Sequence, residues 1–228
     1  MTARAADPAA IASPRDLAPY LDHTVLAPDA GRADVERACE EAREHGFAGV
    51  CVHARFVADV RRILAGTEAK AIAVADFPKG EGTTAARVAE VREAVRAGAQ
   101  EIDVVAPLPL VLAGRWAAVL EDLRAVIDAA AVPVKVILET ARLERDAKVA
   151  LAALARCARA AYVKTSTGFG GGGATVDDVR LLRSVVGDAL GVKASGGVRT
   201  AADALAMVRA GASRVGASAS VRIVTGTF

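Results

Sequence analysis

Two lysines and one aspartate of this 228-residue chain, Lys164, Lys193 and Asp103, are suited to covalent chemistry on a carbonyl group. Only the neutral amine of a lysine attacks a carbonyl carbon, and a free lysine, with a pKa of about 10.4, is less than about 0.1% neutral at pH 7. A second ammonium about 5 Å away, at an effective dielectric constant of about 20, raises the free-energy cost of charging the first by roughly 3 kcal/mol, which lowers its pKa by more than about two units. A lysine pair with a carboxylate that moves protons therefore predicts Schiff-base chemistry.

The alternative is a buried ion-pair network of the same side chains that performs no chemistry. A buried lysine is costly unless it is paired or functional, and one carboxylate cannot neutralise two lysines, which favours the catalytic interpretation. The spacing leaves open which lysine is the nucleophile, and Asp103 fits a general acid and base that works through water. Lys79, in a loop, is a candidate substrate contact, whereas Lys135 begins a strand and is expected at the mouth opposite the active face.

Short β-branched runs alternate with longer Ala-rich amphipathic segments, and these elements must position the three side chains. Eight runs are expected to be strands, at residues 20–26, 49–52, 71–75, 101–105, 132–138, 161–164, 191–194 and 214–217. Six segments are expected to be helices, at residues 33–45, 83–97, 115–129, 143–159, 175–186 and 200–210. Because successive residues of a strand face opposite sides of a sheet, Asp103, Lys164 and Lys193 point away from their apolar neighbours and into one interior.

Eight strands that alternate with helices favour an α/β fold of the closed parallel type, a (β/α)8 TIM barrel, over an open doubly wound sheet. No GxGxxG follows the first strand, as it would in a dinucleotide-binding fold. Residues 20–228 are expected to form a single barrel domain, and residues 1–19 a short, loose N-terminal arm. The active site of such a barrel lies at the C-terminal ends of its strands.

Gly- and Ser-rich turns cluster in the last third of the chain, at residues 167–173, 195–197 and 216–218. Glycines let backbone N–H groups approach an anion, and the loops after the seventh and eighth strands of such barrels often bind phosphate. A tight turn alone explains any single glycine. Two such turns beside a lysine pair predict a phosphorylated substrate, with Arg199 as a further anion ligand.

The composition argues against several classes of protein. The net charge is only +2, and 29 Lys and Arg are interspersed with 27 Asp and Glu, which argues against a nucleic-acid partner. No apolar run reaches the roughly 20 residues that span a membrane. Cys39, Cys51 and Cys157 are odd in number and form no CxxC pair, so we expect reduced thiols in the cytoplasm, no disulfide, and neither a metal nor a cofactor.

Several motifs resemble the deoxyribose-phosphate aldolases, a class I Schiff-base aldolase family, over residues 21 to 224. They are Leu21-Asp22-His23-Thr24, Glu101-Ile102-Asp103-Val104-Val105, Lys135-Val136-Ile137-Leu138-Glu139-Thr140, Lys164-Thr165-Ser166-Thr167-Gly168-Phe169-Gly170 and Lys193-Ala194-Ser195-Gly196-Gly197. The resemblance implies a (β/α)8 carbon–carbon lyase that reversibly cleaves 2-deoxy-D-ribose 5-phosphate to acetaldehyde and D-glyceraldehyde 3-phosphate. A small phosphorylated sugar would be its partner, and the resemblance also suggests a homodimer.

The matched motifs imply a role for each residue. Lys164 would be the Schiff-base lysine, Lys193 the partner that lowers its pKa, and Asp103 the proton-relay carboxylate. Asp22 would be a structural residue or one that supports the catalytic side chains, and His23 is expected to satisfy local hydrogen bonds. Six residues would line the pocket: Thr24, Cys51, Gly168, Gly196, Gly197 and Ser218.

Three positions around the substrate depart from the usual pattern, namely Lys79, Ala106 and Ala219, and they leave the substrate preference open. One alternative is a Schiff-base aldolase with a different donor or acceptor. Another is a catalytically silent phosphosugar-binding barrel, which would bind ligand without forming an imine. The intact lysine pair with its aspartate favours the aldolase.

Overall fold

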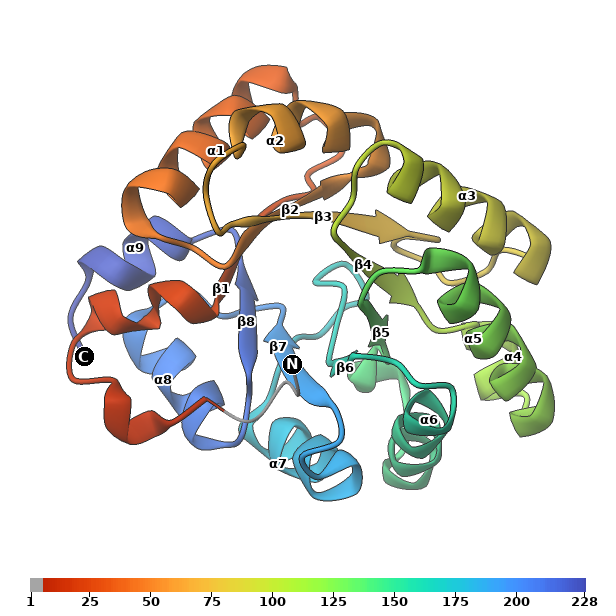
Figure 1. Ribbon diagram of the computed structural model, residues 1–228. Helices are drawn as coiled ribbons and strands as arrows, with labels where there is room; N and C mark the ends of the chain where they lie inside the picture. Colours follow the sequence, from red (N-terminus) through yellow and green to blue (C-terminus); the bar gives the residue numbers. More distant parts are fainter. Residues whose placement is uncertain (1–5) are drawn as a thin grey trace.

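The computed structural model describes residues 6–228 and shows a closed barrel of eight parallel strands surrounded by helices (Figure 1). Each strand pairs with the next in the chain, and β8 pairs with β1. The strands are β1 (Leu21–Val25), β2 (Gly49–His53), β3 (Lys70–Ala75), β4 (Glu101–Val105), β5 (Val134–Ile137), β6 (Tyr162–Lys164), β7 (Gly191–Ser195) and β8 (Arg214–Ala217). The predicted (β/α)8 fold is thereby confirmed, with every strand at its expected place.

The six predicted helices are present, with ends within a few residues of those expected. They are α1 (Arg32–His45), α3 (Thr84–Arg96), α5 (Trp116–Ala130), α6 (Arg145–Cys157), α7 (Val176–Val186) and α8 (Ala201–Arg209). Three more lie outside the predicted set: α2 (Val57–Ile63), α4 (Leu108–Leu112) and α9 (Ser220–Thr225). These have at most seven residues, too few for the helical period to repeat in the sequence. None of the helices within residues 6–228 combines the length and the apolar content that a membrane crossing needs.

Strand alternation divides the barrel into an outer and an inner layer of side chains. Val50 and Val52 of β2 belong to the large core between the strands and the helices, whereas Cys51 between them faces inward. Cys51 forms a small separate apolar cluster with residues of the first three strands, including Ile72 and Val74. The interior next to the other strands is filled by buried charged side chains, which a barrel of this fold does not need for packing alone.

The interpretation of residues 1–19 as a loose arm is wrong for the part that the structure describes. Short 3-10 helices, η1 (Pro8–Ala10) and η2 (Pro14–Tyr20), precede β1, and η2 packs against α8 and α9 (Figure 1). Leu17 is fully buried there, and the backbone N–H of Ala6 donates to the carbonyl of Ala212 at 3.3 Å. Because this segment is rich in Ala and Pro and contains few large apolar residues, its sequence gives no strong signal that it packs against the barrel. The two remaining 3-10 helices are η3 (Ala54–Phe56) and η4 (Thr140–Arg142).

Candidate active site

Asp103 of β4 lies at the centre of a cluster of lysines. Its Oδ2 accepts hydrogen bonds from Nζ of Lys164 at 2.8 Å and from Nζ of Lys193 at 2.7 Å. Lys164 and Lys193 are register partners on the neighbouring strands β6 and β7, which explains why their side chains arrive together. The structure thus brings the three predicted residues into contact, and Asp103 and Lys193 are fully buried.

Lys135 of β5 contradicts its expected place at the opposite mouth. Its Nζ lies 2.8 Å from Oδ1 of Asp103 and 2.5 Å from Oε2 of Glu101. Lys135 does begin a strand, but it is the register partner of Asp103 and also faces the interior, fully buried. Its long side chain therefore reaches the same carboxylate from the other direction.

Asp22 and Arg214 extend the cluster to the junction of the first and last strands. Oδ2 of Asp22 lies 2.5 Å from Nζ of Lys193, and Oδ1 accepts from Nε and Nη2 of Arg214 at 2.9 and 2.6 Å. Arg214 also lies 3.2 Å from Oε2 of Glu101. Asp22 thus contacts one of the two predicted catalytic lysines directly, in line with the expected role of supporting the catalytic side chains.

Opposite charges in this network stabilise the ionised form of one another and offset the cost of burial. Burial would raise the pKa of Asp103, but Lys135, Lys164 and Lys193 hold that pKa well below its usual value of 3.8. Burial likewise opposes a charge on Lys193, but Asp103 and Asp22 raise its pKa. The pKa of Lys135 is raised for the same reason, chiefly by Asp103. These side chains therefore stay ionised at neutral pH.

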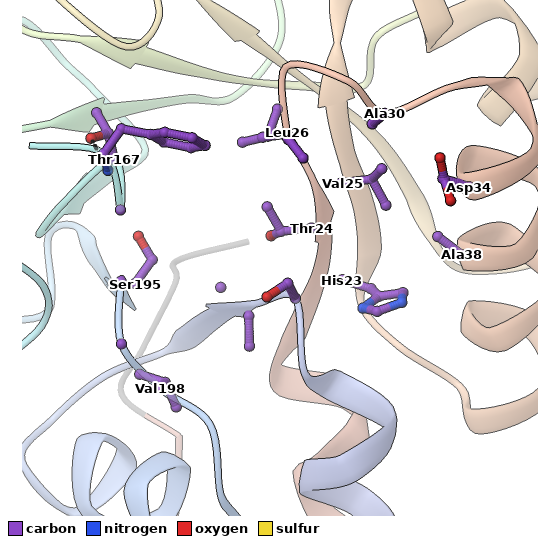
Figure 2. Close-up of a pocket in the computed structure, with 18 of the residues that line it drawn as sticks. His23, Thr24, Val25, Leu26, Ala30, Asp34, Ala38, Thr167, Ser195 and Val198 are labelled. Carbon is purple, nitrogen blue, oxygen red and sulfur yellow. Dashed lines mark hydrogen bonds between the residues drawn. The ribbon is translucent and has the colours of Figure 1, made fainter.

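Lys164 stands at the end of the network and lines a cavity of about 710 Å³. Asp103 is the one carboxylate among the described residues within ion-pair distance of its amine. Figure 2 shows Thr24 on the side of β1 that faces Ser195 and Thr167 across this cavity. An amine at the edge of an otherwise enclosed charge network is thus open to a molecule that enters from solvent.

Five of the six predicted pocket residues line this cavity, namely Thr24, Gly168, Gly196, Gly197 and Ser218. Cys51 does not line it, because its side chain is fully buried in the inner apolar cluster, with Sγ 4.0 Å from Oδ2 of Asp103. Lys79 is exposed and Ala106 is fully buried, and neither lines the cavity. Ala219 likewise lies outside the lining, next to Ser218.

The two glycines after β7 line the cavity in a backbone conformation that residues with a side chain rarely adopt. Gly196 and Gly197 have φ angles of 88° and 80°, in the left-handed region that favours glycine. A Cβ at Gly196 would lie 2.9 Å from Cα of Gly173, so the β6 and β7 loops touch at this point. The guanidinium-bearing Arg199 also lines the cavity and is exposed. Within residues 6–228 no cluster of His, Cys, Asp and Glu could hold a metal ion.

A buried carboxylate after β5 holds the glycine-rich loop, and the sequence did not indicate this role. Glu139 accepts hydrogen bonds from the hydroxyl and, at 3.3 Å, from the backbone N–H of Thr167. The same hydroxyl oxygen accepts from the N–H of Phe169 at 3.0 Å. Glu139 has a φ of 55°, which is uncommon for a residue with a side chain. The sequence motif around Glu139 reveals neither this backbone conformation nor the contact with Thr167.

His23 makes the local contact expected of it. Its Nε2 lies 2.7 Å from Oε2 of Glu41, a residue of α1, and its ring packs against Phe47. Figure 2 shows His23 and Val25 on the side of β1 that faces α1, opposite to Thr24. His23 is therefore directed away from the lysine cluster.

Comparison with known proteins agrees with this arrangement. Residues 17–226 match the model of the DeoC/LacD family aldolases. The chain is 47% identical over 211 residues to the deoxyribose-phosphate aldolase of Alkaliphilus oremlandii (strain OhILAs), which covers 92% of this chain and 95% of that protein.

Solved structures show the same likeness. A crystal structure described as a putative deoxyribose-phosphate aldolase from Coccidioides immitis superposes with a TM-score of 0.89 at 42% identity, covering 91% of this chain and 84% of that one. The deoxyribose phosphate aldolase of Aeropyrum pernix, described as a unique tetramer, superposes with a TM-score of 0.88 at 32% identity, covering 95% and 92% of the two chains.

Proposed function

The chain belongs to the DeoC/LacD family of aldolases, and we propose that it reversibly cleaves 2-deoxy-D-ribose 5-phosphate to acetaldehyde and D-glyceraldehyde 3-phosphate. The substrate is held as a Schiff base on Lys164. The observation that supports this proposal is that Lys164 lines the cavity while its amine and that of Lys193 donate to the same oxygen of Asp103. The choice of substrate follows from the relatives named deoxyribose-phosphate aldolase.

Lys164, rather than Lys193, suits the nucleophile. Lys193 touches two carboxylates, those of Asp103 and Asp22, which raise its pKa and keep it an ammonium. Lys164 touches the shared Asp103 and lines the cavity. Because both nitrogens bind the same oxygen, the fixed charge of Lys193 lies next to Lys164 and favours its neutral, nucleophilic form.

The reaction proceeds through bond changes that these groups can support. The neutral amine of Lys164 attacks C1 of the open-chain sugar, and the carbinolamine loses water to give an iminium ion. Removal of the C3 hydroxyl proton breaks the C2–C3 bond, releases glyceraldehyde 3-phosphate and leaves its electron pair in an enamine. Protonation of the enamine carbon and hydrolysis then release acetaldehyde. Asp103 orients the water that carries these protons, with Lys193 as the neighbouring donor.

In this proposal the phosphate of the substrate binds at the loops after β7 and β8. Gly196, Gly197, Arg199 and Ser218 line that end of the cavity, and their backbone N–H groups, hydroxyl and guanidinium are suitable donors to a phosphate. Turnover of deoxyribose compared with its 5-phosphate measures the preference for a phosphorylated substrate.

Trapping with borohydride tests the proposal. Acetaldehyde and sodium borohydride should convert the imine to a stable ethyl adduct on Lys164, located by mass spectrometry of the digested protein. Lys164→Ala should abolish both the adduct and the cleavage of deoxyribose 5-phosphate. Lys148→Ala is a matched control, because Lys148 pairs with Asp178 at 2.7 Å between α6 and α7 and should leave the adduct intact. Unmodified protein, or an adduct that survives Lys164→Ala, would overturn the assignment.

We also propose that the protein acts in the cytoplasm as a homodimer. Three free cysteines, two of them buried, suit a reducing compartment. A homodimer differs from the assembly of the Aeropyrum pernix relative, which is described as a tetramer. Light scattering coupled to size-exclusion chromatography measures the mass in solution, and a tetramer or a monomer would contradict the dimer.

A further inference from the structure

We propose that Lys135 and Glu101 are positioning residues that set the charge of Lys164 from below Asp103. This inference rests on the proposed function, because it concerns the amine that forms the Schiff base. Lys135 lies 2.8 Å from Oδ1 of Asp103, whereas Lys164 lies 2.8 Å from Oδ2 of the same carboxylate. The two amines are therefore coupled through one group although neither binds the other.

The ion pairs inside the barrel join seven side chains in one continuous network. Four are cations and three are carboxylates, so the network carries one net positive charge when every member is ionised. The members are Asp22 of β1, Glu101 and Asp103 of β4, Lys135 of β5, Lys164 of β6, Lys193 of β7 and Arg214 of β8. An uncompensated charge in a water-excluded interior is costly, so the network favours the loss of one proton.

Lys164 is the member that can release this proton at least cost. It pairs with one carboxylate and opens on the cavity, whereas Lys135 and Lys193 each pair with more than one. Arg214 is a guanidinium, which remains protonated in proteins. Neutral Lys164 leaves three cations against three carboxylates, so the reactive form of the amine is also the electrically balanced form of the interior.

Two other titratable side chains face the network and do not change its charge. Burial, followed by Asp103, raises the pKa of the Cys51 thiol to about 11. Tyr162, whose ring centroid lies 5.8 Å from Nζ of Lys135, also has a raised pKa, mainly through burial. Both are uncharged at neutral pH, so the balance depends on the seven members.

The charge balance makes opposite forecasts for two conservative variants. Glu101→Gln removes a negative charge, so Lys164 should lose its proton more readily and the acid limb of kcat/KM should move to lower pH. Lys135→Met removes a positive charge, so Lys164 should retain its proton and the acid limb should move to higher pH. Each shift should be roughly one pH unit, the order expected when one charge is removed from a buried ion-pair network that includes the titrating amine.

The double variant Lys135→Met/Glu101→Gln keeps one net positive charge, so its acid limb should return to within a few tenths of the wild-type position. The measurement is kcat/KM for deoxyribose 5-phosphate against pH, repeated with the initial rate of borohydride trapping of acetaldehyde, which does not depend on phosphate binding. Glu101→Gln retains an acceptor for Lys135 and Arg214, so it tests the inference even if Lys135→Met fails to fold.

The control is Lys148→Met, which removes a lysine paired outside the barrel interior and should leave the limb in place. Equal loss of activity at every pH, or shifts of the same sign in both single variants, would overturn the inference and assign the two residues a structural role. Failure of the wild-type protein to form any adduct would instead overturn the proposed function. The two failures are thus distinguishable.

Discussion

Phe77 and Phe169 meet edge to face, with ring centroids 5.4 Å apart and ring planes at 87°. The two residues follow β3 and β6, which are not neighbours in the barrel, so this contact spans the mouth. Phe169 lines the cavity that contains Lys164, yet about half of its surface (49%) is exposed. The pair therefore forms an apolar bridge across the mouth, in which Phe77 packs against the core and Phe169 borders the cavity.

Replacing Phe169 by alanine should lower kcat/KM by up to about tenfold, because the loss of the ring admits water to the imine. The free energy of unfolding should fall by roughly 1–2 kcal/mol, because the half-exposed ring loses both its aromatic partner and its partial burial. Steady-state kinetics and urea unfolding measure the two effects. Leu112→Ala is the control, because Leu112 is equally exposed (55%) on α4 but lies outside the cavity. Similar activities for the two variants would exclude a role for the bridge.

Substitutions at Glu139 should separate its backbone conformation from its hydrogen bonds. Glu139→Ala and Glu139→Gly both leave Thr167 without its buried partner and should cost about 1.5–3 kcal/mol. The glycine variant should be the more stable by about 1 kcal/mol, because glycine adopts a φ of 55° without a steric cost. Urea unfolding measures the difference. An alanine variant as stable as the glycine variant would show that the conformation carries no strain.

Cys51 should resist alkylation in the folded protein. Burial and the charge of Asp103 raise the pKa of Cys51 to about 11, and burial raises that of Cys39 to about 12, so few thiolates exist at pH 8. Iodoacetamide should therefore label the exposed Cys157 first. Peptide mass spectrometry gives the three rates, and unfolding in urea should make them similar. Labelling of Cys51 as fast as Cys157 in the native state would indicate that the barrel interior is open.

Acid should weaken the barrel through its buried carboxylates. Arg214 and Lys193 lower the pKa of Asp22 despite its burial, and the pKa of Asp103 is lowered as well, so both bind fewer protons in the folded than in the unfolded chain. The stability they contribute is present above about pH 4 and is lost as pH falls further. The free energy of unfolding should accordingly be steady at pH 5 to 7 and decline below pH 4.

Asp22→Asn provides the test of this origin. It should lower the free energy of unfolding at pH 7 by about 3 kcal/mol or more, because it leaves buried cations short of a partner, and the decline below pH 4 should be shallower. Asp16→Asn is the comparison, since the pKa of Asp16 is also lowered, by hydrogen bonds from Ser13, but at the surface. An acid decline as steep in Asp22→Asn as in the wild type would place its cause elsewhere.

The sequence was sufficient to predict the barrel because local signals agreed along the whole chain. Glycine stops such as Gly46, with a φ of 75°, and β-branched runs mark the same boundaries that the structure has. Alternation also predicted that Asp103, Lys164 and Lys193 face inward. The direction of a side chain across a sheet depends on neighbours in the chain, and a single sequence contains that information.

Depth along the barrel axis was not predictable in the same way. It depends on the stagger between strands, which brought Lys135 into register with Asp103 and contradicted its expected place at the far mouth. The charges of Glu101 and Arg214 likewise meet only after the barrel closes. Cys51 faces inward as alternation requires, but it is covered by the inner apolar cluster and does not reach the wall of the cavity. Strand alternation predicts whether a side chain faces the inside or the outside of the barrel, but not its position along the barrel axis.

The ion pair between Asp22 and Arg214 has a consequence for the protein during its synthesis. Asp22 lies on β1 and Arg214 on β8, near opposite ends of the chain. The carboxylate of Asp22 also binds Lys193. A ribosome-bound chain that has not yet reached β8 lacks this closure, and Lys193 lacks its fixed environment. Because Lys193 shares Oδ2 of Asp103 with Lys164, the charge beside Lys164 is fixed only once the last strand is in place.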